Sequence, residues 1–503
     1  MTIAINAVFP YLALLFGFFF LAFYAIRYYA SICIVLLANT GNGNNNKNGL
    51  RNALSNAHNH KASNNSFSFE YSSLVSIHLP FYNEKNVALR IIDACLSLDY
   101  PNFEVIVVDD STDGTTELVE EFRNSLRLLE IAKKRGVTTS ELDERLKVFH
   151  RDSRQGFKGG ALREALRHTS PKAEFVLIFD ADFIPPRDIV NRFLAYFNGQ
   201  NNGLSLPNNN HKSESEKDIV EAVDGWRKRM EVAGVQGYQL HTLNISENWI
   251  TRGVRTEYSG NYVVERTFQE LFGTMKMIAG SVFMMRADVL NRLGWSESLT
   301  EDWELTLRLY LEGYKVMYTP LIQAPGEIPS TFERLVKQRQ RWSESHTYNV
   351  KRFFWRILKS PKLNAREKLE FIYYAPYYLQ SFFLLVGTFC WVFAEVTHTY
   401  VIGWAPLVGW ILLLANFLSL PLMSLTGLFL EDRVREDYKG IFYQVLLTYF
   451  LAPFQAYSAI KGLFEKREGA WIRTYKTGKI TEAITIFKLR QMVRDVLPGK
   501  RPH

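Results

Sequence analysis

Long uncharged apolar stretches lie near both ends of the 503-residue chain, and a charged region separates them. The first covers residues 8–26, which is about the length that crosses a bilayer as a helix. Two more, residues 371–394 and 401–430, come late and are joined by a short link that has no Lys or Arg. This pattern predicts a multi-pass protein that has the lipid bilayer as a partner and its main folded region between its spans.

Basic residues around these stretches predict which side of the membrane each part occupies. No charged residue precedes the first stretch, whereas Arg27, Lys47, Arg51 and Lys61 follow it. Basic residues also flank the outer ends of the late pair, which therefore forms a hairpin that leaves the cytoplasm and returns. We expect a cell-membrane protein with its catalytic region in the cytoplasm. A cleaved signal peptide fits less well, because a basic segment before the first stretch is missing.

A fourth uncharged stretch, residues 441–460, differs from the others. It contains Pro453, and basic residues flank both of its ends. A simple span would place one of these basic flanks outside. The favoured prediction is a helix that breaks at the proline and keeps both ends in the cytoplasm, and a full span is the alternative.

Strand and helix patterns alternate in the region after the first span. Strands are predicted at residues 74–79, 103–108 and 174–179. They are nearly continuous in apolar residues and alternate with helical patterns, so the expected fold is an α/β sheet with helices on both faces. Ligands of such sheets bind beyond the carboxyl ends of the strands. The polar segments at those ends are residues 80–84, 109–111 and 180–182. We therefore expect these segments to meet in one crevice.

Several residues near the predicted crevice suit an anionic ligand. Asp180 and Asp182 are spaced so that both carboxylates can hold Mg²⁺ or Mn²⁺ against a diphosphate. A glycine-containing helix start with Lys158 also suits a diphosphate, although the Gly-Lys-Ser/Thr order of a Walker A loop is missing. Asp110, taken alone, is equally consistent with a helix cap or a turn.

Composition and charge narrow the possible classes of protein. The net charge is +8, but the basic residues gather near the apolar stretches and no nucleic-acid-binding motif accompanies them, so nucleic acid is not an expected partner. Cys33, Cys95 and Cys390 are spaced neither as a disulfide framework nor as a zinc site. Residues 39–70 are rich in Asn, Ser and Gly, and we expect a linker without fixed structure there.

Two further motifs make the whole series of motifs more distinctive than any single one of them. Thr300-Glu301-Asp302 and Gln338-Arg339-Gln340-Arg341-Trp342 follow the acidic segments in a fixed order. Together the motifs resemble those of processive family 2 glycosyltransferases of the cellulose-synthase-like kind. The resemblance covers residues 74–345 and implies a GT-A fold, a Rossmann-like mixed sheet, joined to transmembrane helices. Independently, Thr300 is expected to cap the helix that follows it.

The resemblance assigns a role to each matching residue. Donor or nucleotide binding falls to Glu84, Asp110, Lys158, Asp180, Arg341 and Lys476. Acceptor binding falls to Glu301, Gln338 and Trp342. Asp302 is the expected catalytic base, and Asp182 with Asp180 is the expected site for Mg²⁺ or Mn²⁺. Residues 471–478 resemble the gating loop of cellulose synthases, although Trp471 and Arg473 depart from its pattern.

The same resemblance divides the chain into regions. They are an N-terminal transmembrane helix (1–38), a linker (39–70), a GT-A domain (71–345), interfacial amphipathic helices (346–369), a C-terminal transmembrane region (370–464) and a cytoplasmic tail (465–503).

The leading hypothesis is an inverting, processive enzyme that extends a β-linked polysaccharide and passes it through the membrane. The donor stays open among UDP-glucose, UDP-N-acetylglucosamine and GDP-mannose, and the acceptor is a glycan or a lipid-linked sugar. One alternative is transfer of a single sugar to a polyprenyl phosphate, and another is a non-catalytic membrane scaffold. The oligomeric state is left open.

Overall fold

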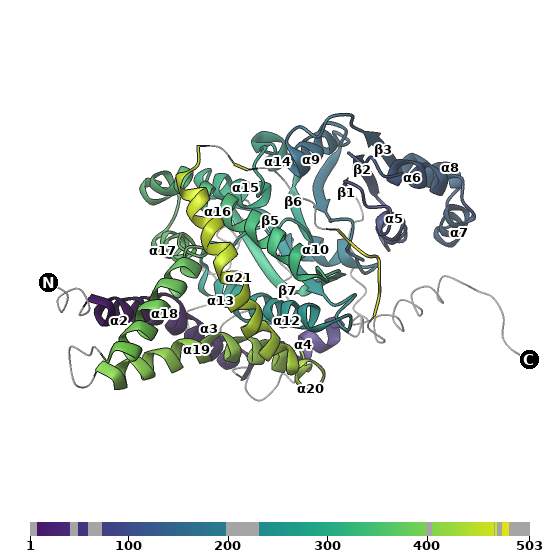
Figure 1. The fold of residues 1–503 in the computed structure, drawn as a ribbon. Coiled ribbons are helices and arrows are strands. Elements are labelled where there is room, and N and C mark those ends of the chain that lie inside the picture. Colours follow the sequence, from purple (N-terminus) through teal and green to yellow (C-terminus); the bar gives the residue numbers. More distant parts are fainter. Residues whose placement is uncertain are drawn as a thin grey trace, which may run out of the picture.

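The protein combines an α/β body with a group of long helices that packs against one end of it (Figure 1). The structure is a computed structural model, and it describes residues 8–40, 49–58, 73–197, 231–398, 405–466, 468–469 and 475–481. The sheet and its helices lie on one side, and the apolar helices from both ends of the sequence lie together on the other.

The sheet has seven strands in the order β3-β2-β1-β4-β6-β5-β7. The strands are β1 (Leu74–Phe81), β2 (Phe103–Asp109), β3 (Leu146–His150), β4 (Ala173–Ile178), β5 (Val232–His241), β6 (Phe283–Arg286) and β7 (Lys315–Gly326). Only β6 runs antiparallel to its neighbours, so the sheet is mixed. The expected α/β, GT-A-like fold is confirmed, and the three predicted strands are β1, β2 and β4. Every residue of β2 is buried, as expected for a strand covered on both faces.

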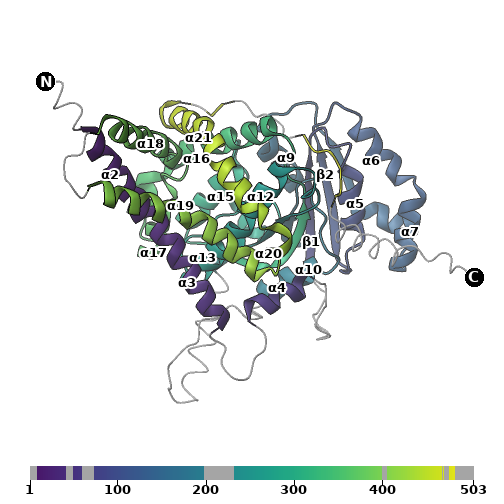
Figure 2. The ribbon, with the colours of Figure 1, turned by 60° about the horizontal axis from the view of Figure 1, so that its bottom comes forward.

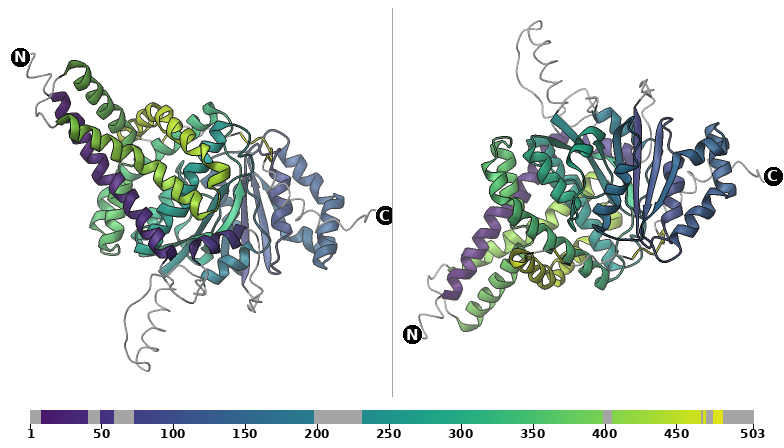
Figure 3. Two further views of the ribbon diagram at one scale, coloured as in Figure 1. Left: turned by 90° about the horizontal axis from the view of Figure 1, so that it is seen from below. Right: turned by 90° about the horizontal axis from the view of Figure 1, so that it is seen from above.

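Helices cover both faces of this sheet (Figure 3). One face packs on α5 (Ala88–Leu96), α6 (Thr115–Arg123), α7 (Leu126–Arg135), α8 (Thr139–Arg145) and α10 (Ile189–Phe197). The other packs on α9 (Phe157–Arg167), α14 (Ala287–Leu293) and α15 (Glu301–Leu311). These two apolar layers cover both faces of the sheet. A ligand can therefore reach the sheet only at the polar ends of its strands.

Further helices connect this body to the apolar group. They are α12 (Trp249–Ser259), the π-helical turn η2 (Gly260–Glu265), α13 (Arg266–Phe272), α16 (Phe332–Lys359) and α17 (Ala365–Tyr374). The domain boundary expected at residues 345 and 346 falls inside α16, which is one helix of 28 residues. Phe353 and Ile357 of α16 are buried against the body, whereas Trp355 is exposed. The stretch expected to be interfacial therefore packs on protein along one side.

Three helices of the described chain are long and apolar enough to cross a membrane, namely Val8–Asn39, Gln380–Thr397 and Leu407–Leu430. The first is longer than predicted because α2 (Val8–Phe20), the π-helical turn η1 (Leu21–Ala25) and α3 (Ile26–Thr40) are continuous. The second, α18 (Gln380–Thr397), starts later than predicted because residues 371–374 complete α17. The third lies in α19 (Ala405–Leu430), and all three lie side by side (Figure 2). Membrane association is therefore supported.

The break predicted at Pro453 is wrong. A short helix, α20 (Val434–Asp437), leads into α21 (Lys439–Phe464), which continues through the proline. Gly440 of α21 lies against Thr256 of α12, and Gly462 lies against the main chain of Glu344 in α16. Packing on two helices offsets the single hydrogen bond that a proline removes. Both ends of α21 therefore pack on helices that connect to the α/β body.

Part of the segment expected to lack fixed structure is folded. Leu50–His58 forms α4, and its Leu50 and Leu54 are buried in a cluster with Tyr238 of β5. Residues four apart in sequence share one face of a helix, so these two leucines can pack together. The prediction from composition was wrong for residues 50–58. It considered the polar segment as a whole and overlooked Leu50 and Leu54, whose burial stabilises this helix.

A fully buried ion pair connects α12 to the end of α19. Arg255 Nη2 lies 2.8 Å from Glu431 Oε2, and the two side chains are 0% and 1% exposed. Tyr238 and Ser259 also donate hydrogen bonds to the Glu431 carboxylate, at 2.8 and 2.7 Å. The carboxylate is thus fully partnered without water.

Replacing Arg255 with Ala should lower the free energy of unfolding by about 3–5 kcal/mol, because it leaves the Glu431 charge buried and unpaired. Thermal unfolding in detergent, followed by tryptophan fluorescence, measures this change. The matched control is Arg167→Ala, which removes an exposed pair with Glu164 and should have an effect below about 1 kcal/mol. Equal effects of the two substitutions would contradict the structural role of the buried pair.

Candidate active site

The carboxyl ends of β1, β2 and β4 and the first turns of α9 and α15 line a pocket of about 290 Å³, here called the strand-end pocket. All the candidate residues from the sequence line it: Glu84, Asp110, Lys158, Asp180, Asp182, Glu301, Asp302, Gln338, Arg341, Trp342 and Lys476. The prediction that the polar segments meet in one crevice is therefore confirmed.

Lys158 lies at the centre of the acidic motifs. Its Nζ is 2.6 Å from Asp180 Oδ1 and 3.3 Å from Glu301 Oε1, and it donates a hydrogen bond of 2.7 Å to the carbonyl of Gly280. Burial alone would lower the pKa of Lys158, but the two carboxylates raise it above its usual value. Its ammonium group is therefore charged when a diphosphate enters.

The two acids of the Asp-Ala-Asp motif have different surroundings. Asp180 is 37% exposed, whereas Asp182 is 5% exposed and lies 2.5 Å from Lys476 Nζ. Burial alone would raise the pKa of Asp182, yet Lys476 holds it below its usual value. The described residues contain no cluster of three or more His, Cys, Asp or Glu side chains that could hold a metal ion. Two carboxylates that complete their coordination with diphosphate oxygens fit this arrangement and the preferences of Mg²⁺.

Asp302 lies in the first turn of α15 and faces the pocket. Its Oδ1 accepts a hydrogen bond of 2.8 Å from the N–H of Trp303. A Cβ at Gly280, which has φ +75°, would lie 3.0 Å from Asp302 Oδ2, so glycine leaves room at this wall. Burial raises the pKa of Asp302 to about 7, with Glu301 adding to the shift and Lys158 opposing it.

The expected cap by Thr300 is absent. Thr300 precedes α15 but makes no side-chain cap. Its Oγ1 instead lies 2.8 Å from Ser345 Oγ of α16. The hydroxyl therefore joins α15 to α16, which fixes the Thr-Glu-Asp motif relative to the helix that carries Trp342.

One end of the pocket is lined by cationic and aromatic side chains. Asp110, expected to contact a nucleotide base, lies 2.6 and 2.5 Å from the Arg151 guanidinium. Burial raises the pKa of Asp110, and Arg151 opposes the shift. The Arg154 guanidinium lies 3.3 Å from the centre of the Tyr82 ring. A base that binds here therefore meets an arginine–carboxylate pair and a flat stacked surface.

The Gln-x-x-Arg-Trp motif lies on α16 and faces the same pocket. Arg341 and Trp342 line it, and burial lowers the pKa of Arg341 although nearby carboxylates oppose the shift. Arg339 points from the same helix to Glu257 of α12, with Nη2 2.8 Å from Oε2. The Arg339 guanidinium also lies 4.8 Å from the centre of the Trp342 ring.

Residues 475–481, here called the C-terminal strap, lie along the pocket. The N–H groups of Thr477 and Gly478 donate to Glu327 Oε2 at 3.1 and 3.3 Å. Arg90 pairs with Glu327 at 3.1 Å and also donates to the carbonyl of Asp182. The strap therefore holds Lys476 beside Asp182. Trp471 and Thr474 lie outside the described residues.

Two family models match this chain. One, described as glycosyl transferase family 2, matches residues 76–294, and the other, glycosyl transferase family group 2, matches residues 215–430. Together they cover the sheet, the strand-end pocket and α19. The chain belongs to the family 2 glycosyltransferases. The resemblance to cellulose-synthase-like members is confirmed, and the protein is a hexosyltransferase.

Curated relatives extend the similarity beyond the catalytic region. Glucomannan 4-beta-mannosyltransferase 7 of Arabidopsis thaliana is 26% identical over 436 residues, which are 86% of this chain and 69% of that protein. Glucomannan 4-beta-mannosyltransferase 1 of Oryza sativa subsp. japonica is 24% identical over 425 residues, 80% of this chain and 69% of that protein. A solved structure, the mannosyltransferase PcManGT from Pyrobaculum calidifontis in complex with GDP-Man and Mn²⁺, is 17% identical with a TM-score of 0.47 and covers 87% of this chain and 99% of its own.

Sequence reasoning missed several residues of this glycosyltransferase pocket. They are Gln239, His241, Tyr258, Tyr262, Arg266, Tyr374, Tyr377 and Tyr378. Burial lowers the pKa of His241 to about 3, so its ring is neutral. Its Nδ1 donates a hydrogen bond of 2.9 Å to the carbonyl of Glu327. No motif marks these positions, and the strand pattern ending at His241 was the available signal.

If Asp302 is the base, as the resemblance implies, its pKa predicts how the rate of this glycosyltransferase depends on pH. A base must be ionised to accept a proton, so kcat should rise as the pH increases through about 7. Below that value kcat should fall by about tenfold for each pH unit. Steady-state release of nucleotide measures the profile, with equilibrium binding of the free nucleotide over the same range as control. A rate that stays flat well below pH 7 would assign the base to another group.

Proposed function

We propose that this family 2 glycosyltransferase is an inverting, processive membrane enzyme that extends a β-linked polysaccharide and takes the growing chain into the membrane. The observation that carries the proposal is that two cavities share part of their walls. The strand-end pocket shares six lining residues with a second cavity of about 400 Å³, here called the membrane cavity. The shared residues are Glu257, Asn261, Arg339, Tyr374, Tyr377 and Tyr378.

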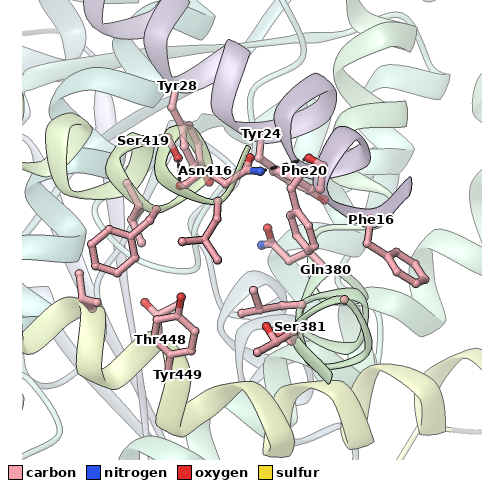
Figure 4. A pocket seen from close by; sticks show the side chains of 18 of the residues that line it. Phe16, Phe20, Tyr24, Tyr28, Gln380, Ser381, Asn416, Ser419, Thr448 and Tyr449 are labelled. Atoms are coloured by element: carbon pink, nitrogen blue, oxygen red, sulfur yellow. Dashed lines mark hydrogen bonds between the residues drawn. The ribbon is translucent and has the colours of Figure 1, made fainter. Parts of the chain in front are cut away.

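The membrane cavity lies among the apolar helices. Side chains of α2, η1, α18, α19 and α21 line it, and several of them are aromatic (Figure 4). The wall also carries amides and hydroxyls, including Gln380, Asn416, Ser419 and Thr448. Flat rings together with amides suit a carbohydrate, which presents apolar faces and hydroxyl edges. A glycan extended at the strand-end pocket can therefore continue directly into this cavity.

The charged groups of the strand-end pocket match the donor diphosphate. Lys158, Arg341 and Lys476 supply positive charge along its wall. Asp180 and Asp182 would hold a divalent cation, Mg²⁺ or Mn²⁺, which when bound would neutralise charge on the leaving diphosphate. The Lys476–Asp182 pair then has to open, so that Lys476 can turn towards phosphate oxygens.

Asp302 is the group that accepts the proton of the acceptor. As the acceptor hydroxyl oxygen forms its bond to the anomeric carbon, the bond from that carbon to the diphosphate oxygen breaks, and the hydroxyl proton passes to the Asp302 carboxylate. A single displacement of this kind inverts the anomeric centre. Trp342 offers a flat surface for the terminal acceptor sugar, and Arg339 beside it keeps the ring in place.

The activity of the relatives favours one of the three candidate donors. Because the two relatives described above are glucomannan 4-beta-mannosyltransferases and match 86% and 80% of this chain, we take GDP-mannose as the favoured donor and a β-1,4-linked mannan-type polymer as the product. Membranes containing the protein should incorporate label from GDP-mannose, and a β-1,4-mannanase should release it. Incorporation from UDP-glucose or UDP-N-acetylglucosamine alone would overturn this donor. Label recovered only in a lipid extract would support single-sugar transfer to a polyprenyl phosphate.

Asp302→Asn should lower kcat by at least about 100-fold while nucleotide binding changes little, because it removes a base and no diphosphate contact. Nucleotide release under saturating donor measures the effect. Asp143→Asn, a substitution of a half-exposed carboxylate on α8, serves as the matched control. A variant that keeps more than about a tenth of the wild-type rate would show that another group is the base.

Asp182→Asn should abolish binding of Mn²⁺ in the presence of nucleotide, because the most buried ligand loses its charge. Electron paramagnetic resonance of free Mn²⁺ gives the bound fraction directly. In the wild type, EDTA should stop transfer and added Mn²⁺ or Mg²⁺ should restore it. Full turnover in excess EDTA would remove the metal from the proposal.

A further inference from the structure

The chain that follows α21 supplies a carboxylate to the turn that precedes α15. Glu468 lies four residues beyond Phe464, where α21 ends. Its Oε1 accepts a hydrogen bond of 2.8 Å from Ser298 Oγ, and its Oε2 accepts one of 2.9 Å from Ser345 Oγ and another from the N–H of Leu299. Ser298 and Leu299 precede α15, and Ser345 belongs to α16. One side chain therefore connects three separate parts of the chain.

The position of Glu468 is fixed by α16, which packs on both α15 and α21 (Figure 1). Before Glu468, Lys351 Nζ donates a hydrogen bond of 2.6 Å to the carbonyl of Glu465. After Glu468, the N–H of Gly469 donates one of 2.9 Å to Glu344 Oε1. The main chain on both sides of Glu468 is therefore attached to the same helix.

The turn before α15 also packs on the helix that carries Lys158. A Cβ on Gly159 of α9 would lie 2.1 Å from the carbonyl oxygen of Ser296, so the two main chains are in direct contact. Lys158 itself reaches Glu301, the first residue of α15, at 3.3 Å. The turn is thus held both by α9, whose Lys158 lines the strand-end pocket, and by Glu468.

Helix α15 starts without a side-chain cap of its own. Thr300, at the cap position, directs its hydroxyl to Ser345 and Asn349 of α16, at 2.8 and 3.2 Å. Burial raises the pKa of Glu468, and the hydrogen bonds that it accepts oppose the shift. Asp302 lies in the first turn of α15, so its position depends on the contacts that hold this start.

We propose that Glu468 is a positioning residue for the base: it holds residues 298–300 so that the Asp302 carboxylate reaches the hydroxyl of the acceptor. This rests on the proposed function, which makes Asp302 the base. Glu468 does not line the strand-end pocket, so it acts through the turn and not by touching a substrate. A side chain outside the site can matter in this way, because a misplacement of about 1 Å can cost about 100-fold in rate.

A displaced base should affect the two possible acceptors differently. A sugar hydroxyl is held by the rest of the acceptor and cannot follow the base, whereas a water molecule can move with it. Under the proposed function the donor contacts come from other residues, among them Lys158, Asp180 and Asp182. Loss of the Glu468 carboxylate should therefore lower transfer to the glycan more than hydrolysis of the donor.

The test uses the full-length protein in lipid nanodiscs with radiolabelled GDP-mannose, or with whichever donor the wild type accepts. Label is counted separately in polymer and in free sugar. Glu468→Ala should lower the kcat of transfer by about 10- to 100-fold and raise the ratio of free sugar to polymer, with the donor KM changed by less than about twofold. Glu468→Gln keeps the length of the side chain and an acceptor oxygen, so it should restore most of the transfer rate.

The ratio of free sugar to polymer separates positioning from a loss of stability. An unfolded molecule neither transfers nor hydrolyses, so a smaller folded fraction lowers both activities and leaves their ratio unchanged. The matched control is Glu465→Ala, which removes a carboxylate three residues earlier that pairs with Lys461 at 3.5 Å. It should leave the rate and the ratio unchanged.

A double substitution tests whether Glu468 acts through the turn. Ser298→Ala removes one of the donors to Glu468 and should raise the ratio in the same direction. Combined with Glu468→Ala it should add little, because both substitutions break the same contact. Fully additive effects on the free energy of activation would overturn the proposal, because Glu468 would then act elsewhere.

The outcomes distinguish this role from the proposed function. An Asp302→Asn variant with the wild-type rate would overturn both, since Asp302 would not be the base. An inactive Asp302→Asn variant together with wild-type transfer in Glu468→Ala would overturn only the role of Glu468. A Glu468→Ala variant that loses transfer and hydrolysis in equal proportion would do the same, because a loss of folded protein would then explain it.

Discussion

The strand-end pocket depends on one buried ammonium group. Lys158 reaches from the first turn of α9 to Asp180 after β4, to Glu301 at the start of α15 and to the carbonyl of Gly280. Without this positive charge, carboxylates from separate elements would repel one another in a poorly solvated site. A positive charge at this place also suits a diphosphate, so the contact that holds the carboxylates together fits the proposed donor.

The helices α12 and α16 determine where the apolar helices lie relative to the strand-end pocket, because they contact both. Each contributes residues to the strand-end pocket and also packs against α21. The buried Arg255–Glu431 pair fixes α12 to the end of α19. The buried Arg255–Glu431 pair is specific in direction, and together with the packing of α21 it fixes α12 and α16 relative to the apolar helices.

The sequence allowed the catalytic half of the site to be predicted because parallel strands end at one edge of a sheet. Asp110 and Asp180 each follow an apolar strand, so their convergence follows from topology alone. His241 and the tyrosines of the strand-end pocket were missed, since they come from helices and a strand that carry no motif. The break expected at Pro453 did not occur, because packing on neighbouring helices outweighed the local preference of proline. Likewise, α4 is stabilised by the tertiary contacts of two leucines, and the polar composition of its segment gives no sign of these contacts.

The central claim is that the strand-end pocket opens into the membrane cavity, so that the polymer enters the membrane while it is being extended. Proteoliposomes with the α/β body facing outwards, supplied with labelled donor outside only, test this most directly. The account predicts that labelled polymer resists an added polysaccharide hydrolase until detergent opens the vesicles. Polymer that the hydrolase digests completely in intact vesicles would contradict it.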